Sequence, residues 1–169
     1  MKTRLTTQAV SLGIVLAAAL SLSGCSILND LVAPPEQRDE EGTIVDGGST
    51  DIFTIAVGDC LVENVSEGAV SAVKTVPCDE PHAGEVFADY TMDEGEYPGE
   101  DAVFAKAEEE CSAGFETFVG LSYEDSTLEF SYYYPVEDTW NEADDRLISC
   151  IIEDPANAEL VGSLSGAGY

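Results

Sequence analysis

Four cysteines spread between residues 60 and 150 constrain the fold more than any other feature of the sequence. They are Cys60, Cys78, Cys111 and Cys150. An even number of cysteines in an exported domain of this size is typical of two disulfide bonds. A zinc site is the competing interpretation, but no pair has the C-x-x-C spacing of zinc ligands and the sequence contains a single histidine. We therefore expect two disulfides, no metal and no cofactor.

The beginning of the sequence predicts the compartment in which these cysteines fold. Lys2 and Arg4 provide positive charge, and an apolar stretch of about a dozen residues follows, shorter than the roughly 20 needed to span a bilayer. Small residues then lead directly to Cys25. This order predicts a lipoprotein signal peptide over residues 1–24, cleaved before Cys25. A two-chain lipid carrying palmitate or a similar acyl group on Cys25 would then hold the protein stably on the outer face of the cell membrane.

The charge of the mature chain limits its partners. All 34 acidic residues lie beyond residue 24, and only four basic residues do. The net charge of the mature chain is therefore 4 − 34 = −30. A surface this negative repels nucleic acid and anionic lipid headgroups. We expect no nucleic-acid partner, contact with the membrane through the lipid on Cys25, and an unidentified envelope protein or wall component as the binding partner.

Composition divides the rest of the chain into three parts. Residues 25–50 contain Pro34-Pro35, a run of acids and few apolar side chains, so we expect a lipidated N-terminus and a disordered acidic linker. Residues 51–154 carry the periodic apolar patterns of a folded domain. Residues 155–169 are rich in glycine, and we expect a loosely held C-terminal tail.

The apolar periodicity of the domain predicts strands on both sides of one long helix. Alternating apolar residues indicate strands near 52–61, 70–76, 85–90, 127–134 and 146–152. Between them, Pro98 and an acidic first turn favour a helix start, and Gly120 favours its end. Apolar residues at helical spacing form one stripe along it: Phe104, Ala107, Cys111, Phe115 and Phe118. This order predicts an α+β fold, with an antiparallel sheet packed against one long helix.

The same patterns select one of the three ways to pair four cysteines. Cys111 lies on the apolar stripe of the helix, and Cys150 lies on a strand face that alternation can turn toward the core. Cys60 and Cys78 flank a predicted hairpin. We therefore expect the disulfides Cys60–Cys78 and Cys111–Cys150.

No group of residues has the pattern of a catalytic site. A Ser-His-Asp or Cys-His arrangement would need His82, but the nucleophile-elbow pattern is missing, because Leu164 occupies the central position of residues 162–166. A pair of carboxylates for glycosidase chemistry carries little information in a chain with 34 acids. We predict no catalytic residue, and for His82 either a structural role or contact with a partner.

Trp140 and Arg146 are the other candidates for partner binding. The acids around Trp140 lack the spacing and the glycine of a calcium-binding EF-hand loop. Arg146 is expected to pair with Asp144 or Asp145 and to order the loop that contains Trp140. The alternative is that an exposed aromatic ring and an arginine anchor a partner.

Several of these residues, in this order and with this cysteine spacing, resemble the septum formation family domain over residues 55–152. The motifs are Val57-Gly58-Asp59-Cys60, Val76-Pro77-Cys78, Pro81-His82, Glu85-Val86, Pro98-Gly99, Cys111, Tyr132-Tyr133-Tyr134-Pro135, Trp140 and Asp145-Arg146 before Cys150. The sequence departs from the family pattern at Asp144, where we expect a glycine before the Asp-Arg pair. The resemblance implies a surface-exposed accessory protein of envelope or division processes, as found in high-GC Gram-positive bacteria, without established catalytic residues.

These observations favour a non-enzymatic, membrane-anchored lipoprotein that binds a partner in the cell envelope and takes part in septum formation. One alternative is a cell-wall-acting enzyme that uses His82 or a pair of carboxylates. A second alternative is a small solute-binding lipoprotein, although one domain of this size cannot form the usual two-lobed clamp.

Overall fold

The computed structural model describes residues 34–63, 70–156 and 159–168. The predicted signal peptide, Cys25 and the linker up to residue 33 lie outside these residues. None of the helices in the described part of the chain is long and apolar enough to cross a membrane.

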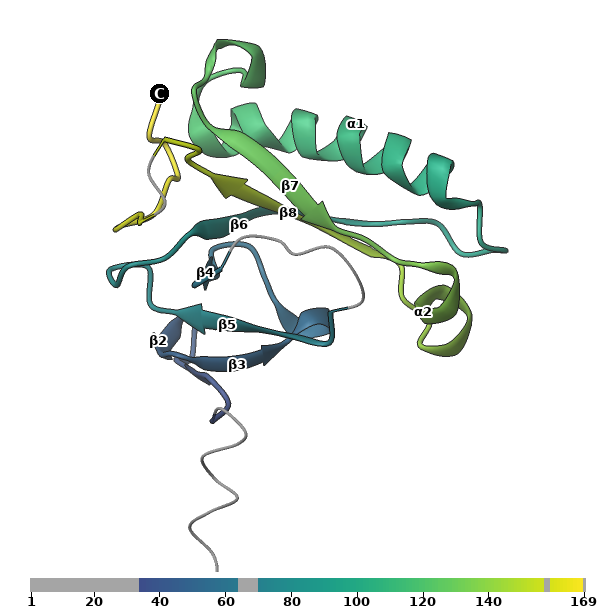
Figure 1. Cartoon of the computed structure of the whole chain (residues 1–169), viewed down its shortest axis with the longest axis horizontal. Helices are drawn as coiled ribbons and strands as arrows, with labels where there is room; N and C mark the ends of the chain where they lie inside the picture. Colours follow the sequence, from purple (N-terminus) through teal and green to yellow (C-terminus); the bar gives the residue numbers. More distant parts are fainter. Residues whose placement is uncertain (1–33, 64–69, 157–158, 169) are drawn as a thin grey trace, which may run out of the picture. The chain divides into compact units, whose positions relative to one another are not determined.

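The described residues form an α+β fold built on an antiparallel sheet, as predicted (Figure 1). Its six strands lie in the order β3-β5-β4-β6-β8-β7. Their bounds are β3 (Gly48–Asp51), β4 (Cys60–Leu61), β5 (Ala72–Val76), β6 (Gly84–Thr91), β7 (Glu129–Tyr133) and β8 (Leu147–Glu153). A smaller sheet pairs β1 (Gln37–Arg38) with β2 (Ile44–Asp46). The short helices are η1 (Ile52–Thr54), η2 (Tyr123–Asp125) and α2 (Glu137–Glu142).

The long helix α1 (Glu100–Val119) covers one face of β6, β7 and β8 (Figure 1). Glu100 and Asp101 lie in its first turn, where acids interact favourably with the helix dipole. The helix ends at Gly120, whose left-handed backbone lets its N–H donate to the carbonyl of Glu116. Its fully buried residues follow one another at every fourth position: Val103, Ala107, Cys111, Phe115 and Val119. The predicted stripe is therefore confirmed at its centre, whereas Phe104 and Phe118 lie at its margins and are only half-buried.

Strand β8 divides the buried side chains between two clusters. Ile148, Cys150 and Ile152 face α1 and join the larger cluster around Phe115. Ile151 faces the other way and packs in a smaller cluster with Ile52, Ile55, Leu61 and Val86. This alternation turns Cys150 toward the helix and explains the disulfide to Cys111.

Both predicted disulfides are confirmed. Cys60 and Cys78 are linked across β4 and the end of β5, with their Cα atoms 5.3 Å apart. Cys111 of α1 and Cys150 of β8 are linked through the core, with their Cα atoms 5.5 Å apart.

The prediction of a disordered linker is wrong for residues 34–50. This segment supplies β1, β2 and most of β3, so the folded unit begins at Pro34 and not at residue 51. Few apolar residues are needed, because β3 pairs with β5 along the backbone and the buried Thr50 hydroxyl hydrogen-bonds Thr75 at 2.6 Å. The guanidinium of Arg38 also binds the buried carboxylate of Asp59.

The prediction of a loosely held tail is wrong for residues 159–168. Leu160 and Leu164 are both only 4% exposed and belong to the larger core cluster. Gly162, Gly166 and Gly168 have positive φ, which allows the chain to turn repeatedly while its N–H groups bond the domain. The glycines therefore mark sharp turns within an ordered segment.

Candidate functional site

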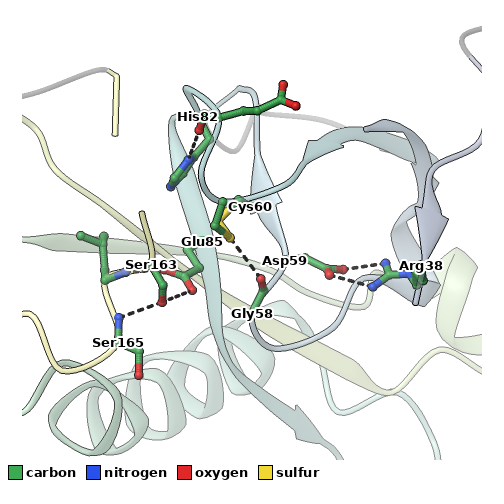
Figure 2. The surroundings of a disulfide bond; sticks show 11 residues. Arg38, Gly58, Asp59, Cys60, His82, Glu85, Ser163 and Ser165 are labelled. Carbon is green, nitrogen blue, oxygen red and sulfur yellow. Dashed lines mark hydrogen bonds and ion pairs between the residues drawn. A yellow bond between two sulfur atoms is a disulfide. The ribbon is translucent and has the colours of Figure 1, made fainter. Parts of the chain in front are cut away.

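A buried polar centre lies where β4, the start of β6 and residues 159–168, here called the C-terminal segment, meet (Figure 2). Cys60 pairs in register with Glu85 across β4 and β6. A carboxylate oxygen of Glu85 and the sulfur atoms of Cys60 and Cys78 lie within 4.8 Å of one another. The disulfide occupies both sulfurs, so these three residues do not form a zinc site in this oxidised state.

The carboxylate of Glu85 is only 1% exposed, and groups of the C-terminal segment bind both of its oxygens (Figure 2). Ser163 Oγ donates to Oε1 at 2.7 Å, and the backbone N–H of Leu164 donates to Oε2 at 2.6 Å. No lysine or arginine forms an ion pair with Glu85 within residues 34–63, 70–156 and 159–168. A buried carboxylate is costly unless hydrogen-bonded, so these two donors are what makes its position tolerable.

His82 lies just before β6 and is 2% exposed. Its Nδ1 donates to the carbonyl of Glu80 at 2.8 Å, since a carbonyl can only accept. Its backbone forms an antiparallel bridge with Leu160, with N···O distances of 3.0 and 2.8 Å. Nε2 has no hydrogen-bond partner in the described part of the chain. His82 therefore holds the turn and the C-terminal segment together, which agrees with the structural interpretation of this residue.

Trp140 of α2 and Arg146 before β8 form a second cluster. The Arg146 guanidinium lies 3.8 Å from the centroid of the Trp140 ring, and its Nη2 pairs with Asp144 at 3.0 Å. The Trp140 Nε1 donates to the carbonyl of Gly95 at 2.9 Å. The predicted pairing of Arg146 with Asp144 is confirmed. Both Trp140 and Arg146 are buried, so their side chains order the loop between β7 and β8 and offer little surface to a partner.

The backbone of Asp144 agrees with the expectation of a glycine at this position. Its φ is +56°, in the left-handed region that most residues avoid and that asparagine and aspartate tolerate best. Aspartate at this position therefore adopts a backbone conformation that glycine would adopt without strain.

The structure does not bring the three candidate residues together. His82 precedes the first residue of β6, whereas the carbonyl of Arg146 accepts from Met92, just beyond the last residue of β6. The candidates thus lie at opposite ends of an eight-residue strand.

Two contacts could not be found from the sequence. One joins Glu85 to Ser163, and the other joins Arg38 to Asp59. Glu85 is one acid among 34, and although it belongs to the motifs of the family resemblance, nothing in its sequence neighbourhood points to Ser163 as its partner. Arg38 carried a usable signal, because it is one of only four basic residues beyond the predicted signal peptide and lies in a stretch that is otherwise acidic.

Aromatic side chains gather where the first half of α1 meets the end of β7. The Phe104 and Tyr134 rings have their centroids 4.8 Å apart, and the Tyr132 hydroxyl donates to Glu108 at 3.0 Å. Burial, followed by this bond to a carboxylate, raises the pKa of Tyr132 to about 12. These rings are half-buried, so they cover the core without forming a separate site.

Comparison with known protein families matches residues 57–167 to the family described as "Septum formation". The match covers more than half of the chain and includes both disulfides, the Trp140 loop and most of the C-terminal segment. No curated protein and no solved structure matches the chain.

Proposed function

We propose a function that starts from one premise: the chain belongs to the septum formation family. The family supports a role in cell division or in the cell envelope. Within that role, the protein acts as a non-enzymatic accessory that binds a partner during septum formation.

The closed polar centre is the observation that carries the non-enzymatic part of the proposal. An enzyme of the kind considered above would need His82 or a carboxylate beside an accessible reacting group. His82 and Glu85 are instead buried, and the chain's own groups bind His82 Nδ1 and both oxygens of Glu85. The four cysteines are joined in disulfides, which leaves none of them as a nucleophile. This arrangement favours binding over chemistry.

The lipid anchor proposed on Cys25 limits where the partner can lie. The folded unit begins at Pro34, only nine residues after Cys25. Nine residues span at most about 30 Å even when fully extended. The domain therefore stays near the outer face of the membrane, much closer than a linker up to residue 50 would allow.

Charge narrows the class of partner further. Nearly all charged residues of the mature chain are acidic, and a field of this sign attracts cationic surfaces while it repels anionic polymers and lipids. The partner that fits best is an envelope protein with a basic segment near the membrane. An anionic wall polymer fits poorly.

Crosslinking of intact cells followed by purification of the anchored protein tests this function. We expect one envelope protein with a basic extracytoplasmic segment to be enriched with the wild type and lost with Cys25→Ala. A fluorescent fusion should concentrate at the septum. A fusion spread evenly around the cell, together with normal division after deletion of the gene, would contradict the septal role.

A further inference from the structure

The C-terminal segment binds the rest of the domain as a peptide ligand would, chiefly through its backbone. Besides the His82–Leu160 bridge, their contacts are mostly backbone hydrogen bonds to carbonyls of other elements. Gly162 donates to Cys78 at 2.6 Å, while Gly166 and Gly168 donate to the carbonyls of Phe118 and Val119 at the end of α1, at 2.7 and 2.9 Å. Backbone recognition of this kind gives affinity to peptide-binding domains, and side-chain pockets give specificity.

Three side chains of the segment supply that specificity. Leu160 and Leu164 enter the core, whereas Val161 between them is 67% exposed. Ser163 donates to Glu85, directly before Leu164, whose N–H binds the other oxygen of the same carboxylate. The recognised pattern is a leucine, then a hydroxyl residue three positions later, followed at once by a second leucine.

The polar side chains of Glu85 and His82 lie beside the segment, and the contacts of both residues involve it. The two groups that donate to the Glu85 carboxylate in the described part of the chain, Ser163 Oγ and the N–H of Leu164, both belong to the segment. The buried Nε2 of His82, whose backbone pairs with the segment, has no hydrogen-bond partner among the described residues. A buried acid and an unpartnered buried imidazole nitrogen are features of a binding groove more than of a packed core.

We propose that this surface is a peptide-binding groove which the chain's own C-terminal segment occupies in cis, and that the partner inserts a segment of the same pattern in its place. The proposal rests on the partner-binding function above and names the site and the ligand class. The segment suits exchange because it forms no strand beyond a single bridge and contains three glycines, whose ordering costs the most backbone entropy. The occupant is a partner and not a second copy, because two strongly acidic chains repel each other.

A labelled synthetic peptide of residues 156–169 tests the groove on the mature chain without its lipid. In the wild type, the segment competes in cis with the added peptide. The apparent affinity for the peptide is then the intrinsic affinity multiplied by the fraction of time that the groove is empty. Leu164→Ala in the chain weakens that competitor, so the peptide should bind it about tenfold more tightly than the wild type. Adding Glu85→Gln should remove this gain, whereas adding Asp79→Asn, an exposed acid nearby, should not. A peptide carrying both Ser163→Ala and Leu164→Ala should fail to bind.

Hydrogen exchange on the unaltered wild type keeps the proposal testable if a variant does not fold. The amides of Leu164, Gly166 and Gly168 should exchange about a hundredfold faster than those of β8, because the segment opens without global unfolding. Equal protection of the segment and β8 would overturn the groove, whatever the crosslinking experiment shows. A dimer that forms by exchange of the segment would also overturn the proposal, because the occupant would then be a second copy. Peptide binding without any crosslinked envelope protein would support the groove and contradict the proposed function.

Discussion

Arg38 and Asp59 are joined by two parallel hydrogen bonds of 2.7 and 2.8 Å, although 21 residues separate them in the sequence. Asp59 is almost completely buried and also accepts from the backbone N–H of Ala56, while Arg38 donates to the carbonyl of Gly42. One side chain of residues 34–50 thus neutralises a buried acid beside the Cys60–Cys78 disulfide (Figure 2).

Arg38→Ala should lower the free energy of unfolding by about 1–3 kcal/mol, because it leaves the Asp59 carboxylate buried without its cation. Arg38→Lys should recover only part of the loss, since an ammonium group cannot reproduce the two parallel bonds. Urea unfolding measures both changes. The matched control is Lys74→Ala, which removes an exposed cation on β5 and should change stability by less than about 0.5 kcal/mol. Equal stability of the Arg38→Ala and Lys74→Ala variants would contradict the structural role of the ion pair.

Elements with a strong local period could be predicted from the sequence. The helical stripe around Cys111 and the alternation around Cys150 are properties of neighbouring residues, and together they gave the fold class and the disulfide pairing. The aromatic residues misplaced the ends of the stripe. Phe104 and Phe118 lie at its margins, against Tyr134 and Phe87, while the smaller Val103 and Val119 are fully buried.

Segments held by distant partners could not be predicted in this way. Residues 34–50 and 159–168 have no marked apolar period, and their order depends on single contacts such as those of Arg38 with Asp59 and Ser163 with Glu85. The candidate site suffered from a related bias. His82, Trp140 and Arg146 were chosen because their residue types are rare in this chain, yet rarity does not indicate exposure and all three are buried.

Removal of the core disulfide should destabilise the domain more than removal of the hairpin disulfide. The Cys111–Cys150 bond closes a loop with a sequence separation of 39, against 18 for Cys60–Cys78, which corresponds to about 4 and about 3 kcal/mol on the chain-entropy estimate. Thermal unfolding of the two double alanine variants measures the difference. A higher melting temperature for the variant that lacks the core disulfide would show that this ranking is wrong.

The single variant Cys111→Ala adds a second readout, because it leaves Cys150 as a free thiol in the core. Non-reducing peptide mapping should then detect some Cys150 linked to Cys60, Cys78 or a second chain. The double variant, which lacks that thiol, is the control and should contain only the hairpin disulfide.

Alkaline pH should weaken the domain through Tyr132. The pKa of this phenol is raised to about 12 by burial and by its bond to Glu108, so the fold favours the protonated, neutral form. A group whose pKa is raised on folding stabilises the folded state fully at pH values below its pKa in the unfolded chain. This contribution is lost as the pH rises through the pKa of the folded state. The free energy of unfolding should therefore fall between pH of about 10 and about 12, and Tyr132→Phe should reduce this fall.

Glu108→Gln separates the carboxylate from burial as causes of the raised pKa of Tyr132. Loss of the negative charge should move that pKa back toward 10, as followed by the ultraviolet absorbance of tyrosinate in comparison with Tyr132→Phe. The control is Glu116→Gln, another exposed acid on α1. If both variants leave the titration of Tyr132 unchanged, its bond to Glu108 does not contribute to the shift.

Cys25→Ala should prevent lipid attachment and move the protein from the membrane fraction to the soluble or unprocessed precursor fraction. The physical reason is that two acyl chains hold a protein stably on a bilayer, and none of the described helices is long and apolar enough to cross it. Ser26→Ala is the matched control and should remain with the membrane. Mass spectrometry of the wild type that finds an unmodified mature N-terminus would exclude the proposed anchor.

Asp144 offers a test of the loop that places Arg146 against Trp140. Its left-handed backbone, with φ of +56°, costs an ordinary residue about 1–2 kcal/mol. Asp144→Ala should destabilise the domain by about 1 kcal/mol, because alanine tolerates this conformation less well than aspartate and cannot pair with Arg146. Asp144→Gly also loses the ion pair but relieves the strain. Its free energy of unfolding should therefore be no more than about 0.5 kcal/mol below that of the wild type.

The comparison of these two variants isolates the backbone effect, since both lack the carboxylate. Glu142→Ala, an exposed acid at the end of α2, is the control and should leave the free energy of unfolding within about 0.5 kcal/mol of the wild type. Urea unfolding and the fluorescence of Trp140 report stability and loop packing in the same experiment. Should Asp144→Gly lose as much stability as Asp144→Ala, the ion pair to Arg146 and not the left-handed backbone would determine the order of this loop.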